Sequence, residues 1–220
     1  NTVNDEDIEI YRDESRSEVL FTWRNLRQQQ EKREGVDYKC LADYIAPKST
    51  GITDYIGMFA VTGGLGIEKH DQRFLDDNDD YSSIMLKAIA DRLAEGFAET
   101  LHARVRRDLW GYVPDESLSN EAVIAEKYQG IRPAPGYPAC PEHEVKKDMF
   151  RVMECEDIDM QLTDGFAMFP ASSVSGFYLS HPMSQYFNVG NIDNDQVQDY
   201  VQRSGRDEDD VRRALASTLR

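Results

Sequence analysis

Polar and apolar residues alternate near the start of the chain and give way to a nearly continuous apolar run further on. Residues 7–12 follow the two-residue period of a half-exposed strand, and residues 19–23 and 40–46 predict further strands. Residues 55–61 are almost wholly apolar, which is typical of a strand that is buried on both faces. Residues 26–34 predict a short polar helix.

The strongest helical pattern covers residues 80–110. Apolar side chains recur there every three or four residues, which predicts one long helix with a single apolar stripe that faces a core. Acidic residues precede this segment and arginines lie near its end, and both placements complement the helix dipole. The stripe consists of Leu86, Ala90, Leu93, Phe97, Leu101, Val105 and Leu109.

A glycine-rich turn at residues 62–66 follows the apolar strand. It matches neither of the common phosphate-loop patterns, and we expect about fifteen residues between it and the next helix. A nucleotide phosphate would then meet no helix N-terminus at this place. We therefore interpret Gly63, Gly64 and Gly66 as residues of a tight turn.

A rigid loop is predicted at residues 132–141, where four of ten residues are proline. Proline fixes φ and removes a backbone donor, so such a loop holds its carbonyls and amides at fixed points, which suits the recognition of a small polar ligand. Arg132 offers a planar fork for a carboxylate, and Tyr137 offers a ring and a hydroxyl. The alternative is a structural proline turn with Arg132 in an ordinary ion pair, and composition alone slightly favours that alternative.

The remaining segments mix short helices and strands. Because the strands come in groups and do not alternate strictly with helices, an α+β fold is favoured over a doubly wound sheet. Helices are predicted at residues 121–129, 142–155, 195–203 and 207–219, hairpin strands at 165–170 and 175–180, and a strand at 186–189.

Two adjacent aromatic residues, Tyr186 and Phe187, are a second candidate for ligand contact. In a strand they point to opposite faces, so one of them can lie in the core while the other covers a ligand. The simpler interpretation, two core or surface aromatics, is favoured by the pattern alone. Glu95 lies close to the apolar stripe of residues 80–110, and a glutamate in a helix is more often solvated than functional.

Composition excludes several classes of protein. The chain has 220 residues, with 41 Asp+Glu against 25 Lys+Arg and a formal charge of −16, which argues against a nucleic-acid binder. No stretch reaches the roughly 18 uncharged apolar residues of a membrane span. The first residues have neither an initiator Met nor the layout of a signal peptide, and we expect a piece of a longer, cytoplasmic protein.

The three cysteines are widely spaced and predict reduced thiols. None of them lies in a Cys-x-x-Cys pair. Cys140 and His143 could share a metal ion, but two ligands make a weak site, and structural histidines are the favoured interpretation. We therefore expect no metal ligands, and the absence of a nucleophile–base pair predicts no catalytic residues.

Taken together, these segments resemble the C-terminal activation domain of cobalamin-dependent methionine synthase. The string Arg-Pro-Ala-Pro-Gly-Tyr-Pro-Ala-Cys-Pro at residues 132–141 is too long and unusual for chance agreement, and the similarity spans nearly the whole chain. The other segments that carry the resemblance are residues 7–14, 54–57, 59–64, 90–95, 118–121, 128–131, 142–143 and 173–176.

The resemblance implies one C-shaped α+β domain over residues 1–220, with a twisted antiparallel β-sheet flanked by helices. It also implies that the chain lacks the N-terminal part of the family domain. The implied function is reactivation of a methyltransferase. The domain presents the methyl group of S-adenosylmethionine to oxidised cobalamin, which a neighbouring domain holds, while flavodoxin or a flavoprotein reductase supplies an electron. The alternative is a non-catalytic docking module for the reductase and the cobalamin domain.

The resemblance also assigns the residues of the ligand site. The position of Phe187 often holds a second tyrosine in the family, so stacking is kept there while a hydroxyl is lost. By motif, the residues that line the S-adenosylmethionine site are Arg132, Ala134, Gly136 and Tyr137, with Tyr186 and Phe187 on its other side and Glu95 from the long helix.

Overall fold

The computed structural model describes residues 1–220, which form two compact units. The first unit consists of Asn1–Gly57, Gln129–Asp148 and Phe177–Arg220, and the second of Met58–Tyr128 and Met149–Gly176. Helices and strands are mixed along the chain, and the strands pair in three small two-stranded ladders. The predicted α+β class is therefore confirmed.

The first unit opens with the two strands that the alternating pattern predicts. β1 (Asp7–Tyr11) pairs with β2 (Val19–Arg24) in antiparallel register, with Ile8 opposite Trp23. Trp23 is fully buried and stacks on Phe177, with ring centroids 3.8 Å apart. This pair fixes the hairpin against the segment that supports the proline-rich loop, described below.

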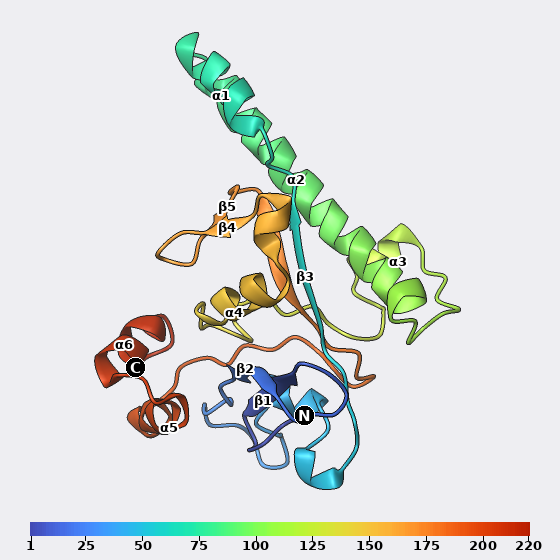
Figure 1. Ribbon diagram of the computed structural model, residues 1–220, viewed down its shortest axis with the longest axis vertical. Helices are drawn as coiled ribbons and strands as arrows, with labels where there is room; N and C mark the ends of the chain where they lie inside the picture. Colours follow the sequence, from blue (N-terminus) through green and yellow to red (C-terminus); the bar gives the residue numbers. More distant parts are fainter. The chain divides into compact units, whose positions relative to one another are not determined.

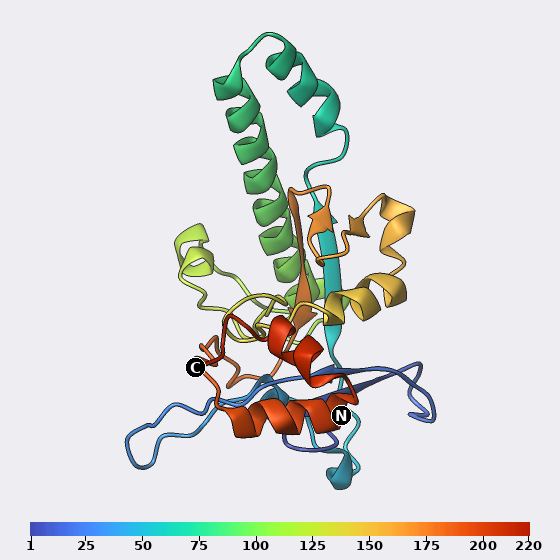
Figure 2. The same ribbon diagram turned by 90° about the vertical axis from the view of Figure 1, so that its left-hand side faces the viewer.

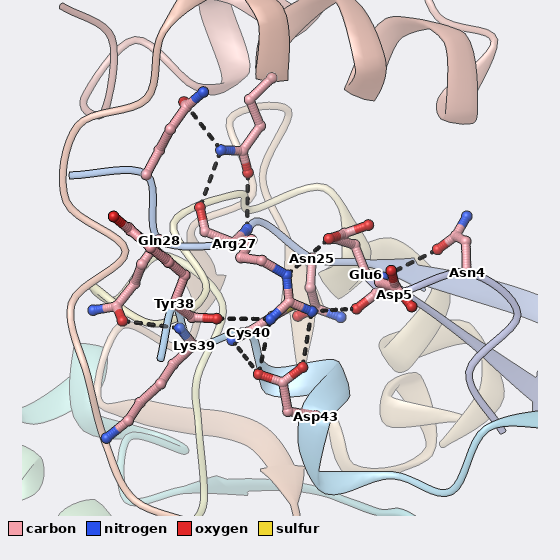
Figure 3. Close-up of polar contacts among 12 residues, drawn as sticks. Asn4, Asp5, Glu6, Asn25, Arg27, Gln28, Tyr38, Lys39, Cys40 and Asp43 are labelled. Atoms are coloured by element: carbon pink, nitrogen blue, oxygen red, sulfur yellow. Dashed lines mark hydrogen bonds and ion pairs between the residues drawn. The ribbon is translucent and has the colours of Figure 1, made fainter. Parts of the chain in front are cut away.

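The segment after β2 contains no helix, so the prediction of a helix over residues 26–34 was wrong. Tertiary hydrogen bonds hold this segment instead, and Arg27 is their centre (Figure 3). Its guanidinium donates to the carboxylates of Glu6 and Asp43 at 2.8–3.0 Å and to the carbonyl oxygens of Asp5 and Tyr38 at 2.7 Å. Periodicity cannot predict such a network, because it joins segments that are far apart in sequence.

The next predicted strand, residues 40–46, is also wrong. Leu41–Tyr44 forms a 3₁₀ helix (η1), and a second short one, η2, covers Lys48–Thr50. The Asp43 carboxylate accepts the backbone N–H of Cys40 at 2.8 Å, which closes the first turn of η1. An aspartate three residues after the helix start stabilises a helical turn, and here this local bond prevails over the apolar run.

Two C-terminal helices complete the first unit. α5 (Asn194–Ser204) and α6 (Glu208–Ala214) lie near the predicted positions, although α6 ends earlier than expected. Figure 2 shows them one above the other in red. Their apolar faces form one cluster with residues of two neighbouring segments. The buried members of this cluster are Leu26, Val189, Ile192, Val197, Tyr200, Val211 and Leu215.

The second unit is built on a helical hairpin. α1 (Ile67–Asp76) folds back along the start of α2 (Asp80–Arg104), as both ribbon views show (Figures 1 and 2). Asp79 caps α2 by accepting the N–H of Ser82, and Lys87 pairs with Asp71 across the hairpin at 2.8 Å. No helix of the structure is long and apolar enough to cross a membrane.

The glycine-rich turn leads into α1 without the gap that the sequence predicted. α1 begins directly after Gly66, so the expected long gap between the turn and the next helix was wrong. Gly66 has a positive φ of 74°, as a tight turn requires, whereas Gly63 and Gly64 are needed for close packing. A Cβ on Gly64 would lie 2.7 Å from Cβ of Pro170.

The long helix was predicted at the correct place, but the prediction of its buried face was only partly right, because Ala90 and Val105 of the stripe are buried while other members of it are exposed. Its buried positions are small or polar residues, whereas Leu93 and Phe97 are 62% and 53% exposed. The reason is the approach of the glycine turn. A Cβ on Gly63 would lie 2.6 Å from the carbonyl oxygen of Ala90. The buried residues of α2 are Ser83, Ala90, Ala94, Ala98 and His102.

The end of α2 widens into a π-helical turn, η3 (Val105–Leu109). It contains Arg106, which is fully buried and donates from Nε and Nη2 to the Glu116 carboxylate at 2.8–3.0 Å. The same guanidinium lies 4.1 Å from the ring centroid of Tyr128. The helix predicted at residues 121–129 is shorter, and α3 covers Asn120–Ile124.

The remaining strands pair differently from the predicted hairpin of residues 165–170 and 175–180. The strand after residue 165 finds its partner earlier in the chain, whereas the later strand pairs with the apolar strand, so the hairpin prediction was wrong. β3 (Gly57–Thr62) pairs with β6 (Ser173–Tyr178), and β4 (Gln161–Leu162) pairs with β5 (Met168–Phe169). In the sequence, α4 (Val145–Val152) and η4 (Cys155–Ile158) lie between the proline-rich loop and β4.

Candidate functional site

The proline-rich loop begins as an extended segment that is fixed on a buried partner in the first unit. Ile131 and Leu179 exchange both backbone hydrogen bonds, at 2.9 and 3.0 Å. The N–H of Phe177 donates to the carbonyl of Pro133 at 2.9 Å. Phe177 and Leu179 are fully buried, so the support does not move with the surface. The backbone on either side of Arg132 is therefore held in place before any ligand arrives.

The tip of the loop is closed by its own backbone. The N–H of Gly136 donates to the carbonyl of Cys140 at 2.7 Å, and the N–H of Cys140 donates to the carbonyl of Tyr137 at 2.9 Å. A third bond runs from the N–H of Tyr137 to the carbonyl of Ala134 at 3.2 Å. Four prolines and these bonds make a preorganised surface, which lowers the entropy that a ligand must remove on binding.

The aromatic segment that follows residue 180 contacts this loop. The hydroxyl of Tyr186 accepts the backbone N–H of Arg132 at 3.0 Å, and the N–H of Val189 donates to the carbonyl of Pro138 at 2.9 Å. Of the seven predicted site residues, the structure thus places five in the loop or in contact with it: Arg132, Ala134, Gly136, Tyr137 and Tyr186.

The other two predicted residues have different surroundings. Phe187 packs against the buried cluster of the C-terminal helices. Residues 186–189 do not form the predicted strand. The two aromatics nevertheless have different surroundings, with Tyr186 against the loop and Phe187 against the core, although the pattern alone favoured the simpler interpretation. Glu95 lies on an exposed position of α2 in the second unit. The roles of both residues at a ligand stay predictions.

The loop offers few but well-defined polar groups to a ligand. The carbonyl of Ala134 and the N–H of Gly136 already bond within the loop, which leaves the N–H of Ala134 and the carbonyl of Gly136 without a protein partner. The Tyr137 side chain is 63% exposed and presents its ring to solvent. One donor, one acceptor, an aromatic face and a guanidinium suit a small ligand that carries a carboxylate and a flat ring.

The loop contains no group that is suited to covalent chemistry. Burial raises the pKa of Cys140 to about 12, so its thiol stays protonated at neutral pH. Burial, with a smaller effect of Lys146, lowers the pKa of His143. No three His, Cys, Asp or Glu side chains of the structure lie together as metal ligands require. The arrangement of the loop is suited to holding and orienting a small molecule.

Sequence reasoning missed the residues that support the loop. Phe177 and Leu179 were expected in a hairpin, and Val189 in an isolated strand, yet all three bond to the loop backbone. His143 was interpreted as structural, without a specific partner, although its ring lies directly against Gly136. The only available signal was the proximity of His143 to the proline string in the sequence.

Comparisons with known proteins agree with this geometry. The family described as the activation domain of vitamin B12-dependent methionine synthase matches residues 1–205. A crystal structure of the MetH reactivation domain bound to AdoHcy is 55% identical, with a TM-score of 0.95. The match covers 100% of this chain and 67% of that chain. The chain therefore belongs to the family of vitamin B12-dependent methionine synthase activation domains.

Proposed function

We propose that this chain binds S-adenosylmethionine at the proline-rich loop and presents its methyl group to cobalamin held by a neighbouring domain. The observation that carries the proposal is the similarity to a reactivation domain that was solved with AdoHcy, at 55% identity over the whole of this chain. AdoHcy (S-adenosylhomocysteine) is S-adenosylmethionine without the methyl group. The same loop can therefore hold the ligand before and after methyl transfer.

The side chains of the loop fit such a ligand. The Arg132 guanidinium pairs with the carboxylate of the amino-acid end, in the planar geometry that arginine offers. The N–H of Ala134 and the carbonyl of Gly136 bond to adenine or ribose edges. The sulfonium and ammonium groups are positive, so the faces of Tyr137 and Tyr186 stabilise them by cation–π attraction.

The chain itself contributes position and orientation. S-adenosylmethionine supplies the methyl group, and cobalamin is the group that receives it. A fixed loop holds the methyl donor in one orientation, and this lowers the entropic part of the barrier to transfer. We propose Glu95 and Phe187 as further ligand contacts, by their family positions alone.

The proposed partners are the cobalamin-binding domain of the same enzyme and an electron donor, flavodoxin or a flavoprotein reductase. A chain with a formal charge of −16 repels an acidic partner over long range. Docking of such a partner therefore needs a local basic surface, and its affinity should depend strongly on ionic strength. Binding of the small ligand in a loop should depend on ionic strength much less.

Calorimetric titration with S-adenosylmethionine tests the proposal directly. The Arg132→Ala variant loses one charge-assisted contact, which should cost about 1.5–3 kcal/mol, or about ten- to a hundredfold in affinity. The matched control is Arg12→Ala, because Arg12 is exposed and pairs only with Glu18 on the β1–β2 hairpin. The control should bind like the wild type.

Two results would contradict the proposal in different ways. If neither wild type nor variant binds S-adenosylmethionine or AdoHcy, the ligand function fails for this chain and the docking module becomes the better account. If all proteins bind equally well, the ligand function stands, but the assignment of Arg132 is wrong.

A further inference from the structure

We propose that His143 is a positioning residue of the proline-rich loop. Its ring fixes the position of the Gly136–Tyr137 turn by contact with the backbone of Gly136. This inference rests on the proposed ligand function of the loop and adds to it a residue outside the proline string. The ring of His143 lies against the loop backbone at Gly136, and we assign it an action on binding through the position of the loop.

The contact between the two residues is unusually close. A Cβ built on Gly136 would overlap the Cε1 atom of the His143 ring and would lie 2.7 and 2.8 Å from its nitrogens Nδ1 and Nε2. The ring therefore directs its Cε1 edge at the Cα of Gly136. Only a residue without a side chain allows this approach, and Gly136 also has a positive φ of 97°.

This contact lies at the part of the loop that has the least other support. The start of the loop is held by Phe177 and Leu179, and its end by Val189. The turn at Gly136 and Tyr137 has bonds only within the loop itself, to Ala134 and Cys140. The imidazole edge is a side-chain contact that limits movement of this turn toward His143.

The position of His143 itself is well defined. It precedes α4, and its carbonyl accepts the N–H of Lys146 at 3.1 Å, so the first turn of that helix holds its backbone. Burial lowers its pKa, which favours the neutral ring at neutral pH. A neutral ring edge can pack against a backbone without bringing a charge to the site.

A double-mutant cycle on binding of AdoHcy tests the inference. His143→Ala should weaken binding about tenfold, because the turn is less preorganised, while the unfolding midpoint changes little. Gly136→Ala should weaken binding about a hundredfold in the wild-type background and about tenfold when His143 is alanine, because the overlap is then gone. The matched control, His70→Ala, removes an exposed histidine of α1 and should bind like the wild type.

Amide hydrogen exchange provides a measurement that needs no ligand. The N–H groups of Gly136 and Cys140 bond within the turn. In His143→Ala they should exchange about tenfold faster, whereas the N–H of Leu179 should be unchanged.

The outcomes separate this inference from the proposed function. If the wild type binds AdoHcy but the two substitutions have additive effects on affinity, the role of His143 is overturned and the ligand function stays intact. The same holds if the wild type binds but amide exchange at the turn is unchanged in His143→Ala. Absence of wild-type binding would overturn the ligand function, and the positioning role would fall with it. Non-additive affinities with faster exchange at the turn support the inference.

Discussion

The proline-rich loop and the long helix α2 show two different ways in which a sequence encodes structure. The loop is a string of special residues, and nearly every one of its backbone bonds is local or reaches one buried support. The helix is a periodic pattern, and its place in the chain follows from that period. Yet the loop was predicted in more useful detail than the helix, because several residues of the predicted apolar stripe, such as Leu93 and Phe97, are exposed.

The difference arises from what each region packs against. Gly136 lies against one side chain of its own segment, so a local string suffices to specify the contact. The inner face of α2 meets the backbone at Gly63, and close approach of a backbone requires small residues on the helix. Periodicity counts large apolar residues and therefore selects a stripe that includes the exposed Leu93 and Phe97 and shares only part of its length with the buried face.

The largest expected effect concerns thiol reactivity in the two units. Burial raises the pKa of Cys140, in the loop, to about 12 and also raises the pKa of Cys155, in the second unit. The thiolate of Cys140 at neutral pH should be about a thousandfold rarer than that of an ordinary cysteine. Mass mapping after timed alkylation should find Cys155 modified before Cys140. Prompt alkylation of Cys140 in the folded chain would mean that the loop opens readily.

Next in size is the effect of a methyl group at two glycines. Gly136→Ala adds a Cβ at a positive φ and against His143, and should lower the free energy of unfolding by about 2–4 kcal/mol. Gly96→Ala adds one in the middle of α2, where nothing lies within 4 Å. This change should raise the free energy of unfolding by about 0.5–1 kcal/mol, because alanine has a higher helix propensity than glycine. Urea denaturation measures the free energy of unfolding of both variants. If the two substitutions changed it equally, the proposed difference between the loop and the helix would be contradicted.

A smaller effect on stability distinguishes the buried face of α2 from the predicted apolar stripe. Ala98→Leu places a large side chain on the fully buried inner face and should lower the free energy of unfolding by about 1–3 kcal/mol. Leu93→Gln changes an exposed residue and should alter it by less than about 0.5 kcal/mol. The same urea experiment decides between the faces. A large loss in Leu93→Gln with none in Ala98→Leu would restore the stripe that the sequence predicted.

The smallest expected effect is a pH dependence beside the loop. Burial raises the pKa of Glu142, so the folded chain binds this proton more tightly than the unfolded chain. The stability that Glu142 contributes therefore falls as the pH rises from the unfolded value, about 4.3, through the folded value. Glu142→Gln removes this titration. Its unfolding free energy relative to wild type should increase between about pH 4 and about pH 7, and an unchanged or decreasing difference would contradict the raised pKa.

Much of the fold was predictable where local rules decide. Alternation located β1 and β2, the apolar period located α2, and the starts of α5 and α6 were predicted within one residue. Prediction failed where distant groups decide. Arg27 holds an extended segment that has the composition of a helix, and the Gly63 approach requires small residues on the buried face of α2.

The candidate site follows the same division. Arg132, Ala134, Gly136 and Tyr137 are adjacent in sequence and lie together by necessity, and the pairing of Tyr186 with the Arg132 backbone agrees with its predicted place. The supports Phe177, Leu179 and Val189 come from segments that the sequence assigned to other elements. A backbone bond leaves no mark on residue type, so these contacts had no signal in the sequence.

The division of the chain into interleaved segments has a consequence for how it folds. The first unit is assembled from three separate stretches, and two excursions into the second unit interrupt it. The backbone bonds between Ile131 and Leu179 form only after the long stretch of chain between these residues has closed. Closing this stretch lowers the entropy of the chain before the bonds that stabilise it are made. Such topology slows folding. During synthesis on the ribosome, the proline-rich loop cannot gain its backbone support until the residues from 177 to 189 have emerged.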